Sequence, residues 1–210
     1  DLNSVGTVTI SPSDVNNGST WDCGFGSWSV SPNTFSCSDV GQHTVTLTLT
    51  DALGWTSTCQ STVTVRDVTN PVINTAATGQ TVECDGTGNT TAYNNWISSH
   101  GGASASDACG GTWSDNHRGV SDGCGASGAE TVLFTYTDPS GNKAQTSAEF
   151  KIVDTTPPNV TCPSNIHRPE CVSTASWTAT TSDVCGAVSV VSDPPRSEEH
   201  TSELQSPDHL

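Results

Sequence analysis

The residues best suited to chemistry are aspartates and an asparagine in turn-like motifs. Asp107 stands in S-D-A-C-G, Asp138 and Asn142 stand in D-P-S-G-N, and Asp67 opens the linker D-V-T-N-P. Carboxylate and amide oxygens are the ligands of Ca²⁺, which takes about six to eight of them. Without a cation, clustered aspartates would repel one another. The sequence therefore predicts a Ca²⁺ site if the fold gathers these four; the alternative is that they only form Asx-turns and cap loops.

A second set of the same kind follows. Asp154 stands in D-T-T-P-P and Asp183 in S-D-V-C-G, and the two predict an equivalent site, incomplete because the repeated pattern stops soon afterwards. The formal net charge of -16, with only six Lys and Arg residues, fits either a bound cation or a halotolerant surface. Nucleic-acid binding is excluded, since it would need clustered basic side chains against the phosphates.

The nine cysteines favour disulfides. Zinc needs closely paired ligands such as C-x-x-C, which do not occur here, and nothing suggests the base that a nucleophilic cysteine would need. Disulfides indicate an oxidising compartment, so we expect a secreted, extracellular or cell-surface protein. Connectivity cannot be deduced from sequence, but pairs within one structural unit are preferred: Cys23–Cys37, Cys109–Cys124 and Cys162–Cys185. Three cysteines are left over: Cys59, Cys84 and Cys171. A bond between Cys59 and Cys84 could bridge units A and B.

Catalysis is not expected. The sequence has no H-E-x-x-H or G-x-S-x-G motif, and its carboxylates lie in turn motifs rather than beside an aromatic cleft, which argues against a glycosidase. Two tryptophans on strand patterns predict core positions, Trp113 and Trp177. Three in loops or a short helix are candidates for carbohydrate binding: Trp21, Trp55 and Trp96. Three asparagines head N-x-S/T sequons that matter only if the source glycosylates: Asn17, Asn89 and Asn159.

Two segments of the chain repeat each other. Thr44–Pro71 and Thr131–Pro158 align without a gap at a constant offset of 87 residues, which pairs Gly54 with Gly141. In each, apolar residues alternate with threonines, as in a strand with one row in a core and one in water. A D-A-L-G or D-P-S-G turn follows, then a second strand, and then a proline that cannot join the ladder. Each segment is predicted to be a β-hairpin that runs into a linker.

The repeat divides the chain. We expect unit A (1–66), unit B (67–153), a partial unit C (154–195) and a tail (196–210). Unit A starts late relative to unit B and is expected to lack its first strand, which would leave an open edge that invites strand donation from a neighbouring chain. The only expected helix is Thr91–Ser99.

Composition fits thin β-sandwich cores rather than helical bundles. Hydrophobic residues make up 32% of the chain and Met is absent, while Thr, Ser, Gly and Val are abundant. No apolar run is long enough to span a bilayer, so membrane insertion is not expected. Neither a signal peptide nor a starting Met is present, which predicts a mature protein or an internal fragment.

The fold prediction is all-β: tandem immunoglobulin-like sandwiches joined by short linkers. In that topology a linker lies at the same pole as the last hairpin turn of the unit that it enters, and near the loop before the third strand. The four ligand candidates Asp67, Asp107, Asp138 and Asn142 are therefore expected to converge at the A–B junction.

The motifs also resemble a known family. D-T-T-P-P-N-V-T-C-P-S-N-I with S-D-V-C-G is similar to the opening of a hyalin repeat, and the motifs of units A and B resemble related repeats found in tandem in large bacterial surface and adhesin-like proteins. Unit A departs from this family in two places. Where D-x-C-G is expected it has W-D-C-G, so that its aspartate is displaced by one position, and Trp55 stands where unit B has Asn142. From Arg196 to Ser206 the text resembles a translated sequencing adapter, and we interpret it as an artefact.

The resemblance implies secreted, non-catalytic repeats that build stalks, fibres or adhesive arms. We therefore expect a structural segment of a cell-surface protein or extracellular fibre, packed against neighbouring repeats and rigidified by disulfides and Ca²⁺. One alternative is a fibre subunit that forms a homo-polymer by strand donation into unit A. Another is a carbohydrate-binding module of a secreted hydrolase, with glycans as partners.

Overall fold

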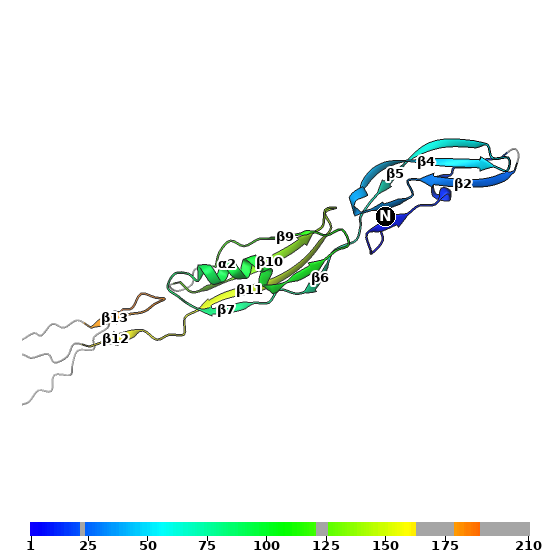
Figure 1. Cartoon of the computed structure of the whole chain (residues 1–210). Helices are drawn as coiled ribbons and strands as arrows, with labels where there is room; N and C mark the ends of the chain where they lie inside the picture. The colour runs from blue at the N-terminus through cyan, green and yellow to red at the C-terminus, as the bar shows by residue number, and fades with distance from the viewer. Residues whose placement is uncertain (22–23, 121–125, 163–178, 190–210) are drawn as a thin grey trace, which may run out of the picture.

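The computed structural model describes residues 1–21, 24–120, 126–162 and 179–189. Strands dominate, and the all-β prediction is confirmed. Units A, B and C follow one another along a single line, so that the described part of the molecule is an elongated rod (Figure 1). No helix within the described residues is long and apolar enough to cross a membrane.

Unit A is a small sandwich of two sheets. One has the strand order β2-β4-β5 and the other pairs β1 with β3. The elements are β1 (Thr7–Thr9), α1 (Pro12–Val15), β2 (Phe25–Ser31), β3 (Thr34–Ser36), η1 (Cys37–Asp39), β4 (Gly41–Asp51) and β5 (Thr56–Val65). Its core is made by Leu2, which precedes β1, together with inward residues of these strands: Val30, Phe35, Val45 and Val65.

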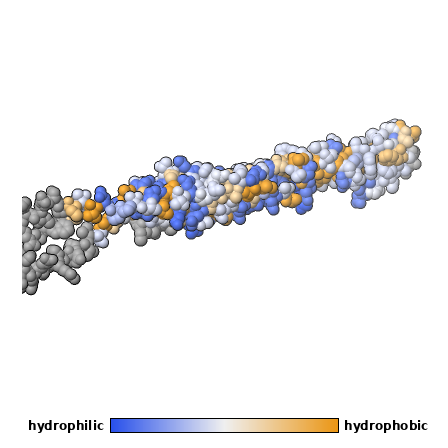
Figure 2. Space-filling view, turned by 90° about the horizontal axis from the view of Figure 1, so that it is seen from below, coloured by the Kyte–Doolittle hydropathy of each residue, from blue (hydrophilic) through white to orange (hydrophobic). Residues whose placement is uncertain are grey.

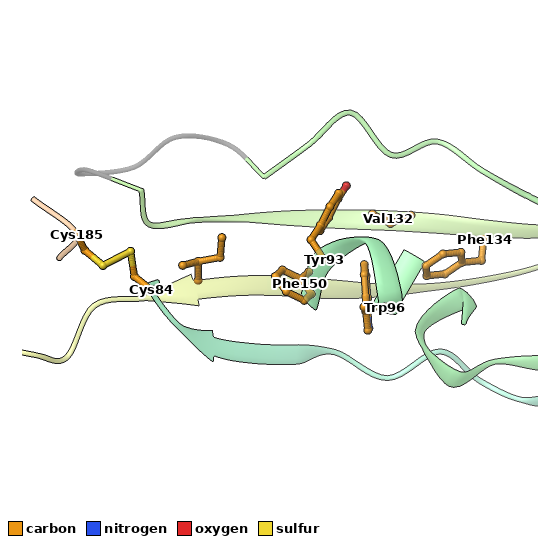
Figure 3. Packing of buried hydrophobic residues seen from close by; sticks show 8 residues of the cluster. Cys84, Tyr93, Trp96, Val132, Phe134, Phe150 and Cys185 are labelled. Atoms are coloured by element: carbon orange, nitrogen blue, oxygen red, sulfur yellow. A yellow bond between two sulfur atoms is a disulfide. The ribbon is translucent and has the colours of Figure 1, made fainter. Parts of the chain in front are cut away.

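Unit B has a larger sandwich with a helix packed in its core. Four strands form the order β7-β11-β10-β9, and β6 pairs with β8. The elements are β6 (Val72–Thr75), β7 (Gln80–Glu83), α2 (Thr90–Ser98), η2 (His100–Gly102), β8 (Ser104–Ser106), β9 (Thr112–Asp115), β10 (Gly128–Thr137) and β11 (Lys143–Val153). Helix α2 turns Tyr93 and Trp96 toward Phe134 and Phe150 (Figure 3). Of unit C the structure describes β12 (Asn159–Thr161) and β13 (Thr180–Ser182), which pair antiparallel.

The repeated hairpins have the same register. Val45 pairs with Ser61 in unit A, and Val132 pairs with Ala148 in unit B, at the offset of 87 that the sequence shows. The turns match as well, since Gly54 and Gly141 have φ angles of 91° and 93°. This positive φ is strained for any residue with a side chain, which explains the glycine. The hairpins β4–β5 and β10–β11 thus have the same structure although their sequences differ.

The units differ at one sheet edge. In unit B the strand β7 pairs in parallel with the end of β11, and the N–H of Cys84 then donates to the carbonyl of Val153 at 2.8 Å. In unit A the N–H of Leu2 donates to the carbonyl of Arg66 at the same distance. Within the described residues, however, no strand pairs with the outer edge of β5. Leu2 is therefore the counterpart of Cys84, and among the described residues no strand of unit A takes the position of β7.

The following loops confirm that equivalence. The side chain of Asn3 accepts the backbone N–H groups two and four residues further on, at 3.0 and 3.1 Å. The side chain of Asp85 does the same at 2.8 and 3.0 Å. The two loops share no obvious sequence motif, and the repeat was not recognisable there from the residues alone.

Candidate functional site

The A–B junction gathers the four predicted metal ligands. The linker supplies Asp67, the loop between β8 and β9 supplies Asp107, and the β10–β11 turn supplies Asp138 and Asn142. Carboxylate oxygens of Asp67 and Asp107 lie within 4.8 Å of each other and of the sulfur of Cys109. The turn is joined to Asp67 by a hydrogen bond, because the Asn142 amide nitrogen donates to the Asp67 carbonyl at 3.3 Å. Within the turn the same nitrogen donates to Asp138 Oδ2 at 2.8 Å.

Each of these side chains also has a local structural role. Oδ1 of Asp67 accepts the N–H of Thr69 at 3.0 Å, and Oδ1 of Asp107 accepts the N–H of Cys109 at 2.8 Å. These are Asx-turns, so the alternative prediction is partly realised. Asn142 uses its nitrogen rather than its oxygen, which makes it a residue that positions Asp67 and Asp138.

One oxygen of Asp67 has no hydrogen-bond partner among the residues that the structure describes. The residue is only 8% exposed, and its Oδ2 is buried without a hydrogen bond from any described residue. The ion pairs among the described residues are Arg66–Asp1 and Asp115–His117, so neither neutralises Asp67. A buried carboxylate oxygen without a donor or cation is costly, by about 1–3 kcal/mol or more. The cluster is thus arranged to accept positive charge.

The disulfides join units rather than closing loops within them. Cys37 of unit A bonds to Cys109 of unit B, and Cys84 of unit B bonds to Cys185 of unit C. The predicted pairing within units is therefore wrong for Cys37, Cys109 and Cys185. The reason is that the S-D-A-C-G loop of Cys109 and the S-D-V-C-G loop of Cys185 lie at the pole that faces the preceding unit, so these cysteines meet that unit first.

The other cysteines divide into two groups. Cys59 and Cys162 are free and exposed, so neither the predicted Cys162–Cys185 bond nor the suggested Cys59–Cys84 bridge forms. The remaining three lie outside the described residues: Cys23, Cys124 and Cys171.

Both junctions are tightly packed. A Cβ on Gly6 would lie 2.7 Å from the sulfur of Cys37 and 3.3 Å from the Cβ of Ala108 in the next unit. A Cβ on Gly86 would lie 2.6 Å from the carbonyl oxygen of Val184, again in the next unit. Both glycines have a φ of +74°. In each case the residue approached directly precedes the S-D-x-C-G cysteine, so the two junctions use the same close contact.

The B–C junction has the same turns but a different polar centre. Asp154 accepts the N–H of Thr156 at 3.1 Å, and Asp183 accepts that of Cys185 at 2.8 Å. Asp154 is exposed, and within the described residues no group of three metal-ligating side chains forms around it. The carboxylate of Glu83 instead accepts the N–H and hydroxyl of Thr155, at 2.8 and 2.9 Å, and the hydroxyl of Thr156 at 3.1 Å.

These bonds make the B–C linker contact sensitive to acid. The Thr155 N–H, followed by the two hydroxyls, holds the pKa of Glu83 below the ordinary 4.5. Because the folded pKa is the lower one, the contact stabilises the junction above the unfolded value and is lost as pH falls through the folded value. An NMR titration should show the Thr155 amide and the Glu83 carboxyl shifting together with a midpoint below 4.5. Substituting both threonines by valine should raise that midpoint, and an unchanged midpoint would contradict the assignment.

The predicted tryptophans differ in how far they are exposed to solvent. Trp96 is 5% exposed and its indole N–H donates to the carbonyl of Thr78, so its prediction as a carbohydrate ligand is corrected: α2 directs it into the core. Trp55 is 76% exposed, and half-buried Trp21 packs edge-on against Phe25 at 4.9 Å. Trp113 is half-buried and stacks on His100.

Trp177 and the tail from Arg196 lie outside the described residues. Asn17 and Asn159 are exposed. Asn89 is buried, and its amide donates to the carbonyl of Glu83 at 2.8 Å. The prediction of glycosylation at Asn89 is therefore wrong for the folded protein.

The fold and junctions define a class: all-β sandwich units arranged in tandem. No protein-family model matches the chain, and no curated protein matches it. Among solved structures the chain is similar to the crystal structure of human CDH23 EC21-23, with 18% identity and a TM-score of 0.33 over 87% of this chain and 68% of that chain.

Proposed function

We propose that the chain is a non-catalytic structural segment of a secreted cell-surface or adhesin-like protein or an extracellular fibre, built of hyalin-like repeats. The observation that carries this proposal is the disulfide across each of the two junctions. A covalent bond at every joint restricts bending between units, which is the property that a stalk or spacer needs. Disulfides are also typical of proteins that work in oxidising compartments.

One hollow beside α2 bears on the non-catalytic part of the proposal. Its volume is about 620 Å³. Among the described residues that line it, Tyr93 is the only one with a titratable side chain. Burial, and then the hydrogen bond to Glu130, raises the pKa of Tyr93, so it stays protonated. An acid and base pair is what a hydrolase would need.

Removal of the A–B disulfide should allow units A and B to bend relative to each other. In small-angle X-ray scattering, the chain carrying Cys37→Ala and Cys109→Ala should show a broader pair-distance distribution than the parent, because the two units can then reorient about the linker. Cys59→Ala, which removes a free and exposed cysteine, is the matched control and should leave the curve unchanged. Identical curves for the double variant and the parent would refute the stapling role.

Calcium is the proposed cofactor of this segment, at the A–B junction, where acidic oxygens converge. A cation there would hold the linker against the hairpin turn of unit B, and so would add a second restraint beside the disulfide. Oxygen donors of this kind suit Ca²⁺.

A second candidate function is polymerisation by strand donation. It is favoured by the outer edge of β5, which has no parallel partner among the described residues, whereas β7 provides one to β11. Sedimentation velocity tests it, because a donated strand would produce oligomers whose fraction rises with concentration, whereas a spacer stays monomeric.

A further inference from the structure

The two junctions differ in how the linker carboxylate is satisfied. We infer that the A–B junction binds one Ca²⁺ anchored by Oδ2 of Asp67, and that the described residues of the B–C junction bind none because Glu83 holds its linker directly. This inference deepens the proposed function and rests on it, since it concerns the restraint of the same junctions.

The buried oxygen is what separates this cluster from an ordinary acidic surface. Asp67 is 92% buried, being 8% exposed, and Oδ2 has no donor within the described residues. A carboxylate oxygen of Asp107 lies within 4.8 Å of one of Asp67, which is the separation that one ion can bridge with ligand distances of about 2.3–2.6 Å. Asp138 is 5% exposed and is tied to Asp67 through Asn142. The carboxylates of Asp67 and Asp107 thus lie close together at a buried oxygen, and Asn142 links the buried Asp138 to the backbone of Asp67.

The chemistry of the donors selects the ion. Cys109 is bonded to Cys37, so its sulfur cannot act as the thiolate ligand that zinc prefers. The ligands left are carboxylate oxygens together with backbone carbonyls and water, a set suited to Ca²⁺. Mg²⁺ demands a smaller, near-octahedral shell and is expected to bind more weakly.

At the B–C junction the corresponding carboxylate needs no ion. Asp154 is exposed, so water solvates it. The linker beside it donates one N–H and two hydroxyls to Glu83. The residue of unit A that corresponds to Glu83 is Asp1, because Leu2 corresponds to Cys84. The side chain of Asp1 pairs with Arg66 instead of holding the A–B linker. Protein hydrogen bonds thus restrain the B–C linker, whereas the A–B cluster is left with excess negative charge.

Asp67→Asn and Asp154→Asn form a matched pair for testing this. Asparagine keeps the oxygen that accepts the N–H of the residue two positions on, and replaces the charged second oxygen by a neutral NH₂ group. Calorimetric titration of the full chain with CaCl₂ should show one site in the parent, at least tenfold weaker binding in Asp67→Asn, and unchanged binding in Asp154→Asn. MgCl₂ should bind the parent at least tenfold more weakly than CaCl₂.

Thermal melts supply a second readout that a merely structural role would not produce. In EDTA, Asp67→Asn should melt at or above the parent temperature, because the unpaired buried charge is gone. In millimolar Ca²⁺ the order should reverse, because only the parent gains from an ion bound to the folded state. Asp107→Asn should behave in the same way, with a smaller effect, and serves if Asp67→Asn fails to fold.

Four outcomes would overturn the inference: no binding by the parent, two sites in the parent, equal binding by Asp67→Asn, or weakened binding by Asp154→Asn. None of them would change the scattering result for the disulfide variants, so a failure here is distinguishable from a failure of the proposed structural role.

Discussion

Replacing Cys84 and Cys185 together by alanine is expected to lower the free energy of unfolding by about 4.7 kcal/mol. The bond joins residues 101 positions apart, and closing a loop of roughly 100 residues restricts the unfolded chain by about that amount. Both cysteines also belong to the core of unit B, where their sulfurs pack at the end of the sandwich (Figure 3). The effect should therefore exceed that of any single surface substitution.

Urea denaturation followed by tryptophan fluorescence measures this change. Cys162→Ala is the matched control, because that cysteine is free and exposed and should shift stability by less than about 0.5 kcal/mol. If the double variant unfolded at the same urea concentration as the parent, the bond between units B and C would not be part of the folded protein.

Trp96→Ala is expected to destabilise unit B by about 3–5 kcal/mol, the usual cost of removing a large aromatic side chain from a core. The indole packs against Phe134 and Phe150, with ring centroids 5.4 Å apart in both cases. Its N–H also satisfies the carbonyl of Thr78 at 2.9 Å. Truncation would leave a cavity between α2 and the sheet and would leave that carbonyl without its donor.

Trp55→Ala is the control for Trp96, since Trp55 is 76% exposed. It should change stability by less than about 0.5 kcal/mol. The same pair tests the carbohydrate alternative: if a glycan binds the exposed surface, Trp55→Ala should weaken its binding. A small stability change for Trp96→Ala, measured by urea denaturation, would contradict the packing seen here.

The sequence was informative where the physics is local. The paired hairpins were predictable because alternation of apolar residues with threonine determines a strand, and D-x-x-G determines its turn. Helix α2 was predictable, within one residue at each end, from a short polar stretch that ends at two glycines. The convergence of Asp67 with Asp107 followed from the pole at which linkers and turns lie in such a sandwich.

What could not be predicted depends on contacts between units or on the direction of a side chain. The partner of Cys109 is set by how unit A docks on unit B, and nearness in the sequence pointed to Cys124 instead. Trp96 and Asn89 stand in motifs that look exposed, but one faces the sheet and the other anchors its own loop. Occupation of the metal site and strand donation into unit A stay predictions, since both need a partner.

Exposed apolar residues gather at particular places on the surface of the molecule. Apolar patches interrupt an otherwise hydrophilic rod, one of them at the tip of unit A (Figure 2). Phe25, Leu53 and Trp55 are exposed in unit A; the last two lie in its hairpin turn, at the end that in unit B is covered by the preceding unit. The aromatic character of that end of unit A was visible in the sequence as the replacement of an asparagine by Trp55.

The two disulfides enclose stretches of chain that overlap between Cys84 and Cys109. A pull applied at both ends of the molecule would pass from Cys37 to Cys109, back along the backbone to Cys84, and out through Cys185. Both large hairpins, β4–β5 and β10–β11, lie off that path and would carry no tension. With both disulfides intact, the sheets can unfold under load and the end-to-end extension of the chain still has a fixed upper limit. That limit is set by the two disulfide bonds rather than by the mechanical strength of the sheets.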